Sequence, residues 1–101
     1  MSTNLQVAKT ILSQIGGNRV VAMIGAHSFT GTENALTFKF KARASNSSNC
    51  IRITLTPDDL YKVEFISLRG KSVKTKGEFD SIYAEDLKHL IEKETRLYLS
   101  L

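Results

Sequence analysis

The sequence predicts an α+β domain with an N-terminal helix, a four- or five-stranded antiparallel sheet and a C-terminal helix packed on one face. Two observations support this fold class. Apolar and polar residues alternate in consecutive segments between residues 35 and 68, a pattern typical of strands that bury one face. Apolar residues spaced three and four apart flank these segments, as in helices that cover a sheet. A chain of 101 residues has an ordinary domain size, so we expect residues 1–101 to form a single domain.

The first helix is predicted over Asn4–Ile15. Ser2 or Thr3 can cap its start by accepting a hydrogen bond from a free backbone amide. Gly16-Gly17 ends it, because glycine enters the left-handed region at little cost. Its apolar stripe consists of Leu5, Ala8, Ile11, Leu12 and Ile15.

Residues Arg19–Ile24 form a short, mostly apolar run that is rich in β-branched side chains and is followed by Gly25. This composition predicts a strand. Residues 25–34 contain Gly31 and several small polar residues and predict a loop, which at ten residues is long enough to be an ordered hairpin extension.

Three strands are predicted next, over Ala35–Ala42, Cys50–Leu55 and Tyr61–Leu68. A polar loop at residues 45–49 and a proline turn at residues 56–59 separate them. A tight turn at residues 69–71 leads to a more polar edge strand over residues 72–79. The residues expected to face the core are Leu36, Phe38, Phe40, Ile51, Ile53, Leu55, Tyr61, Val63 and Phe65.

The second helix is predicted to begin near Tyr83, with acidic residues in its first turn and basic residues in its last, as the helix dipole prefers. Its buried stripe is Ala84, Leu87, Leu90 and Ile91, with the Thr95 methyl group or Leu97. The chain then ends in an apolar segment, which we expect to dock on the domain or to make homo-oligomer contacts through Tyr98, Leu99 and Leu101.

The charge is uneven. Residues 39–76 contain nine basic and three acidic residues, whereas residues 77–101 contain three basic and six acidic ones. Pleat parity predicts that many of these cations face away from the core, where they can contact nucleic acid or a protein partner. An ordinary solvated sheet face is the alternative, and aromatic residues for base stacking are missing from this outward set. The candidate contact residues are Lys39, Lys41, Arg52, Lys62, Lys74 and Lys76.

The residue spacings predict no catalytic, cofactor or metal site. His27 and His89 lie far apart, and neither has a second histidine or a cysteine within four residues. A Ser28–His27 pair, or Cys50 with either histidine, needs a geometry that spacing does not supply. Cys50 is the single cysteine, which fits a reducing compartment. With neither a long apolar run nor a secretory pattern at Met1–Asn4, we expect a cytoplasmic protein that does not span a membrane.

The chain resembles a widespread family of small tailed-phage and prophage proteins, over about residues 8–101. The segments that carry this resemblance are Gly16–Arg19, Met23–Ala26, Leu36–Lys39, Ile51–Leu55, Leu60–Phe65, Tyr83–Leu87 and Leu97–Leu101. The resemblance implies a phage-encoded protein made inside a bacterial cell. It supplies no catalytic or binding residues.

Three functions are therefore predicted in order of preference. The first is a non-enzymatic accessory protein that binds a host component, for example to inhibit a host defence or transcription complex. The second is a non-specific nucleic-acid-binding module that uses the cationic sheet face. The third is a virion structural or assembly protein.

Overall fold

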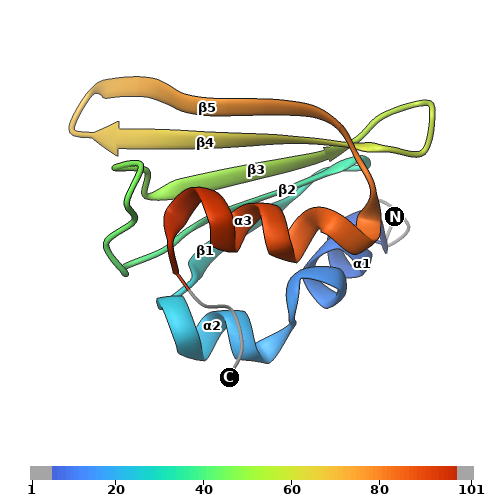
Figure 1. Cartoon of the computed structure of the whole chain (residues 1–101), viewed down its shortest axis with the longest axis horizontal. Coiled ribbons are helices and arrows are strands. Elements are labelled where there is room, and N and C mark those ends of the chain that lie inside the picture. Colours follow the sequence, from blue (N-terminus) through green and yellow to red (C-terminus); the bar gives the residue numbers. More distant parts are fainter. Residues whose placement is uncertain (1–5, 98–101) are drawn as a thin grey trace.

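A computed structural model describes residues 6–97 of the chain. Figure 1 shows two layers, with a five-stranded antiparallel sheet on one side and the helices on the other. The strands follow one another across the sheet in chain order, from β1 at one edge to β5 at the other. The elements are α1 (Gln6–Ile15), α2 (Asn18–Ile24), β1 (His27–Gly31), β2 (Ala35–Lys39), β3 (Cys50–Leu55), β4 (Tyr61–Arg69), β5 (Ser72–Ile82), the 3₁₀ turn η2 (Ala84–Asp86) and α3 (Leu87–Thr95).

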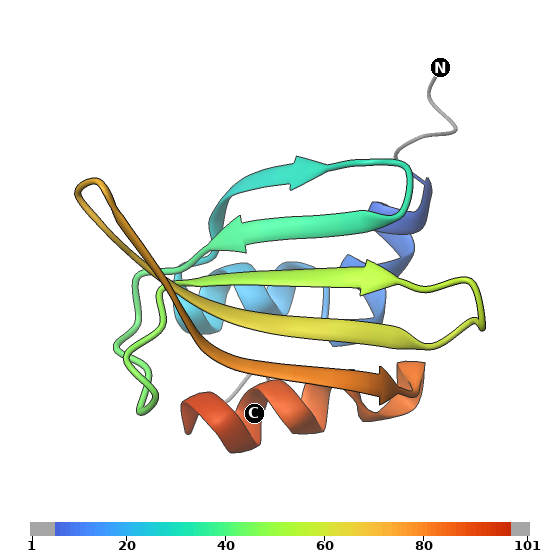
Figure 2. The same ribbon diagram turned by 90° about the horizontal axis from the view of Figure 1, so that it is seen from above.

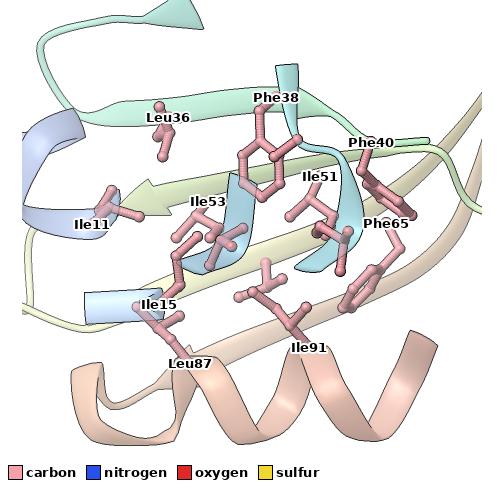
Figure 3. Close-up of a cluster of buried hydrophobic side chains, with 14 of the residues drawn as sticks. Ile11, Ile15, Leu36, Phe38, Phe40, Ile51, Ile53, Phe65, Leu87 and Ile91 are labelled. Carbon is pink, nitrogen blue, oxygen red and sulfur yellow. The ribbon is translucent and has the colours of Figure 1, made fainter. Parts of the chain in front are cut away.

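The predicted fold class is confirmed. The predicted alternation of core-facing and outward-facing residues in the central strands is confirmed as well. Phe38 and Ile53 are almost completely buried, while Lys39 and Arg52 are exposed. Figure 3 shows the core-facing side chains of β2, β3 and β4 meeting isoleucine and leucine side chains from α1 and α3. The sheet therefore has one apolar face, and the helices remove that face from water.

The strand predicted over Arg19–Ile24 is wrong, because these residues form α2. Val20 and Ile24, four residues apart, are both buried, whereas Val21 between them is 40% exposed. That spacing is helical, and packing of the Val20–Ile24 stripe on the core outweighs the strand preference of β-branched residues. Gly25 ends α2 in the left-handed conformation and donates its N–H to the carbonyl oxygen of Val21.

The fifth strand of the sheet is instead β1, within the predicted loop at residues 25–34. The expected hairpin extension is thus present, since β1 and β2 pair antiparallel. β1 is an edge strand with an irregular register between His27 and Thr30, and three of its five residues are exposed. Its sequence lacks apolar alternation because it contributes little to the core. Phe29 is the exception, since its ring lies 5.4 Å from that of Phe38.

Candidate functional site

The middle of the outer sheet face carries charges of both signs. Thr37, Arg52, Glu64 and Glu78 occupy successive partner positions across β2 to β5. Arg52 lies 3.7 Å from Glu64, and Lys62 forms a 2.7 Å ion pair with Glu78 that raises the pKa of the lysine. Two of the predicted contact residues, Arg52 and Lys62, are therefore bound to carboxylates. The sheet face is less cationic than the sequence predicts.

A bulge in β5 moves another predicted contact to the opposite face. Phe65 pairs with Gly77, but the next residue of β4, Ile66, pairs with Thr75, so Lys76 is an extra residue in β5. Beyond this bulge Lys74 pairs with Ser67, which lies two residues after Phe65 in β4 and therefore points to the same, core-facing side. The predicted outward orientation of Lys74 is therefore wrong, since a single extra residue reverses strand parity.

The β4–β5 hairpin continues past the rest of the sheet as a two-stranded ribbon, which we call the basic ribbon (residues 67–76). The last β3 partner of β4 is Cys50, opposite Ile66, and three further pairs extend the hairpin alone. Figure 2 shows this ribbon coiling away from the sheet beyond the ends of β2 and β3. Its exposed cations are Arg69, Lys71, Lys74 and Lys76.

One face of the basic ribbon is hollowed. A depression of about 190 Å³ is lined by Ser67, Arg69, Ser72, Lys74 and Lys76. Three cations and two hydroxyl groups therefore share this face, and no carboxylate is among the described residues that line it. Lysine, arginine and serine side chains are among the groups that contact phosphate oxygens in protein–DNA complexes.

A larger depression adjoins the ribbon, and we call it the basic hollow. It has a volume of about 820 Å³. Its cations are Lys41, Arg43, Arg69 and Arg96, and the described residues that line it include no carboxylate. Arg69 lines both depressions, so the two adjoin at this residue. The remaining lining residues are Phe40, Ala42, Ala44, Ser45, Ser47, Ser48, Asn49 and Thr95.

Backbone hydrogen bonds hold the loop that forms the floor of the basic hollow. The N–H groups of Lys41 and Ala42 both donate to the carbonyl oxygen of Ile24, at 3.1 and 3.0 Å. Ser45 donates to the carbonyl oxygen of Thr95 at the end of α3, at 2.8 Å. The backbone of the loop that carries Lys41 and Arg43 is thus attached to the end of α2 and the end of α3.

Two side chains complete the loop. The Oδ1 atom of Asn46 accepts hydrogen bonds from the N–H and the hydroxyl group of Ser48, while its buried Nδ2 atom has no hydrogen-bond partner among residues 6–97. Asn49 pairs through its side chain with the backbone of Leu68, in two bonds of 2.8 Å each. The second interaction joins the loop to the base of the basic ribbon.

The opposite end of the molecule is acidic. Figure 1 places the β3–β4 turn and the start of α3 at the end of the sheet away from the basic ribbon. The turn carries Asp58 and Asp59, and Asp80 lines a depression beside Asp58. The hydroxyl group of Thr56 donates to Asp58 and lowers the pKa of that carboxyl group. Charge is thus separated along the strands, whereas the sequence predicted a separation between the sheet and the C-terminal helix.

The signal for this arrangement was present in the sequence as acid-free segments. No aspartate or glutamate occurs at residues 34–57 or 65–77, and these segments supply the loop and the ribbon. The positions that the sequence prediction missed are Arg43, Arg69, Lys71 and Arg96. Of the predicted contacts, Lys41, Lys74 and Lys76 belong to the basic end, whereas Lys39 is an exposed residue of β2 paired with Cys50.

The remaining candidate residues lie elsewhere. His27 Nδ1 and Ser28 Oγ are 2.9 Å apart on the exposed edge strand, and neither residue lines the two depressions of the basic end. His89 is exposed on α3. Within residues 6–97, no group of three or more histidine, cysteine, aspartate or glutamate side chains is placed to hold a metal ion. The proposed oligomer contacts Tyr98, Leu99 and Leu101 lie outside the described residues, while Leu97 packs against the core.

No protein-family model matches the chain, and neither a curated protein nor a solved structure matches it. Among the described residues, the helices are too short or too polar to cross a bilayer.

Proposed function

We propose that this chain is a non-enzymatic nucleic-acid-binding protein that contacts phosphates with its basic end. The basic end consists of the exposed cations that line the basic hollow or belong to the basic ribbon, namely Lys41, Arg43, Arg69, Lys71, Lys74, Lys76 and Arg96. The observation that carries the proposal is their convergence from three separate segments onto a surface whose described lining includes no carboxylate.

The arrangement favours a polyanion over a small acidic ligand. The cations are exposed and spread along a loop, a hairpin and a helix end, so they match a row of phosphates. Binding to such a row releases counterions. The logarithm of the association constant therefore falls linearly with the logarithm of the salt concentration, and the slope of this line, the salt slope, is about −0.9 per phosphate contact. The acidic opposite end repels the same polyanion and orients the approaching molecule.

The test is fluorescence anisotropy with a labelled 20-base-pair DNA duplex, titrated between 50 and 200 mM salt. Arg69→Gln/Lys74→Gln removes two cations from the basic end. Arg52→Gln/Lys62→Gln is the matched control, since it removes one arginine and one lysine from the sheet face, where each is bound to a glutamate. We expect the first variant to reduce the salt slope by about 2, as each lost phosphate contact lowers it by about 1, and the control to keep it.

Two results would overturn the proposal. One is an absence of duplex binding by the unmodified protein at 50 mM salt. The other is an equal loss in both variants, which would show that net charge alone governs binding.

A host protein partner, a phage origin and a cytoplasmic location rest on the resemblance and the sequence pattern, and they stay predictions. Affinity purification of a tagged copy from a bacterial host tests the partner. A single protein that co-purifies after nuclease treatment, and still does so with the Arg69→Gln/Lys74→Gln variant, would favour the accessory function over nucleic-acid binding.

A further inference from the structure

We infer that the basic ribbon enters the major groove of duplex DNA, so that double-stranded DNA is the ligand of the basic end. This inference rests on the proposed function and specifies its ligand. It is carried by the dimensions of the ribbon, by the difference between its two faces, and by the side chains that the basic end lacks.

The dimensions fit. The ribbon extends beyond β3 by the pairs Ser67–Lys74, Leu68–Val73 and Arg69–Ser72. Three residues of strand span roughly 10 Å, and two strands lie about 5 Å apart. The major groove of B-form DNA is about 12 Å wide and 8.5 Å deep, which admits a two-stranded ribbon, whereas the minor groove is about half as wide.

The tip is narrow enough to insert. Arg69 and Ser72 pair directly, so the turn contains only Gly70 and Lys71. Gly70 has a φ of +59° at the first turn position, where a type II′ turn requires glycine. Lys71 therefore stands at the leading end of the ribbon, where a lysine can donate to guanine O6 and N7 in the groove.

The two faces differ in the way that groove binding requires. Arg69, Lys74 and Lys76 share the hollowed face, which adjoins the basic hollow at Arg69 and can follow one phosphate backbone. Leu68 and Val73 occupy the other face, where Val73 is 68% exposed. An exposed valine near the tip of a hairpin is suited to contact the C5-methyl group of thymine, which projects only into the major groove.

The described residues of the basic end offer no stacking platform for single strands. Phe40, the aromatic residue that lines the basic hollow, is buried. The exposed aromatic residues of the described chain are Phe29, on β1, and Tyr83, before η2. Proteins that bind single strands rely on aromatic residues under successive bases, so single-stranded DNA is disfavoured.

Anisotropy with a duplex and with its separate strands tests the ligand class, and we expect roughly tenfold weaker binding of the single strands because base stacking is missing. Dimethyl sulfate footprinting tests the groove, since guanine N7 lies in the major groove and adenine N3 in the minor groove. We expect protection of N7 but not of N3. Val73→Ser should lower affinity about two- to threefold for a duplex that contains thymine. It should leave affinity unchanged for the same duplex with uracil in place of thymine, because uracil lacks the C5-methyl group. Thermal denaturation verifies that the variant folds.

Equal binding of single strands, or protection of N3 without N7, would overturn this inference. Salt-dependent duplex binding that Arg69→Gln/Lys74→Gln weakens would still stand in that case, so the proposed function can survive when the groove assignment fails. Tighter binding of duplex RNA than of duplex DNA would also exclude the major groove, because the A-form major groove is too deep and narrow for a ribbon.

Discussion

The side-chain amide of Asn49 pairs with the backbone of Leu68 as a strand residue would. Its Nδ2 atom donates to the Leu68 carbonyl oxygen and its Oδ1 atom accepts from the Leu68 N–H, both at 2.8 Å. The Asn49 backbone N–H also donates to the carbonyl oxygen of Ile66, at 3.0 Å. These bonds extend the β3–β4 pairing past Cys50 and join the loop of the basic hollow to the base of the basic ribbon.

Replacing Asn49 with aspartate should destabilise this junction. Asn49→Asp removes the Nδ2 donor and places a carboxylate oxygen against the Leu68 carbonyl oxygen. Leaving a partly buried acceptor unpaired costs about 1–3 kcal/mol, which urea denaturation measures. Asn34→Asp is the control, since it makes the same change in an exposed loop and should stay within about 0.5 kcal/mol of the unmodified protein. Equal losses in the two variants would assign the effect to charge.

Arg96 ends α3 in the left-handed conformation, with a φ of 63°. A non-glycine residue there costs roughly 1 kcal/mol relative to glycine, so Arg96→Gly should raise the free energy of unfolding by about that amount. The same change removes a cation from the basic hollow and should weaken duplex binding. Stability and affinity are thus expected to move in opposite directions.

Arg96→Gln separates these two effects. It removes the charge but keeps a side chain in the strained conformation, so affinity should fall as in Arg96→Gly without the gain in stability. Denaturation midpoints and anisotropy on the same samples measure both quantities. Unchanged DNA affinity in both variants would remove Arg96 from the binding surface.

Gly25 positions Lys41. A β-carbon at Gly25, where φ is +67°, would lie 3.1 Å from the Cβ atom of Lys41. Gly25→Ala should therefore incur both backbone strain and a steric contact, which together cost about 2 kcal/mol. Thermal or urea denaturation measures the loss, and a loss of about 1 kcal/mol or less, which the backbone strain alone explains, would contradict the packing argument.

The sequence predicted β2 to β4 and the core because each of these strands buries one face, which imposes alternation on residues such as Phe38 and Ile53. It predicted β5 from the tight turn before it and from its polar composition, which suits a sheet edge. It did not predict α2, because its two buried positions are also β-branched or apolar residues with high strand preference. It anticipated β1 only as a hairpin extension of a loop, because three of the five residues of this edge strand are exposed and show no apolar alternation. A local sequence pattern identifies elements in which buried and exposed residues alternate regularly. It misses elements with few buried residues, such as β1, and elements whose buried residues also favour another structure, such as α2.

The site was harder to predict, because it depends on where strands end. Alternation assigned Lys74 to the outer face, and one bulge at Lys76 reversed it. The sequence does not give the register of the strands, so it could not show which side chains lie beside Arg52 and Lys62. In the structure each of these two cations forms an ion pair with a glutamate. Arg43, Arg69 and Arg96 are distant in sequence and meet only because β2, β4 and α3 end on the same side of the fold.

Cys50 links stability to pH. It is 4% exposed, and burial raises the pKa of its thiol, although Lys39 and Arg52 oppose that shift. Above the pKa of the unfolded thiol, about 8.5, the unfolded chain loses a proton that the folded chain keeps. The stabilisation is therefore fully present below that pH and declines as pH rises through the folded pKa, by at most about 1.4 kcal/mol per pH unit. Urea midpoints of the unmodified protein and Cys50→Ala between pH 7 and 9.5 measure this, since the variant cancels the other titrating groups. A difference between the two proteins that stays constant over this range would mean that the native thiol ionises as readily as the unfolded one.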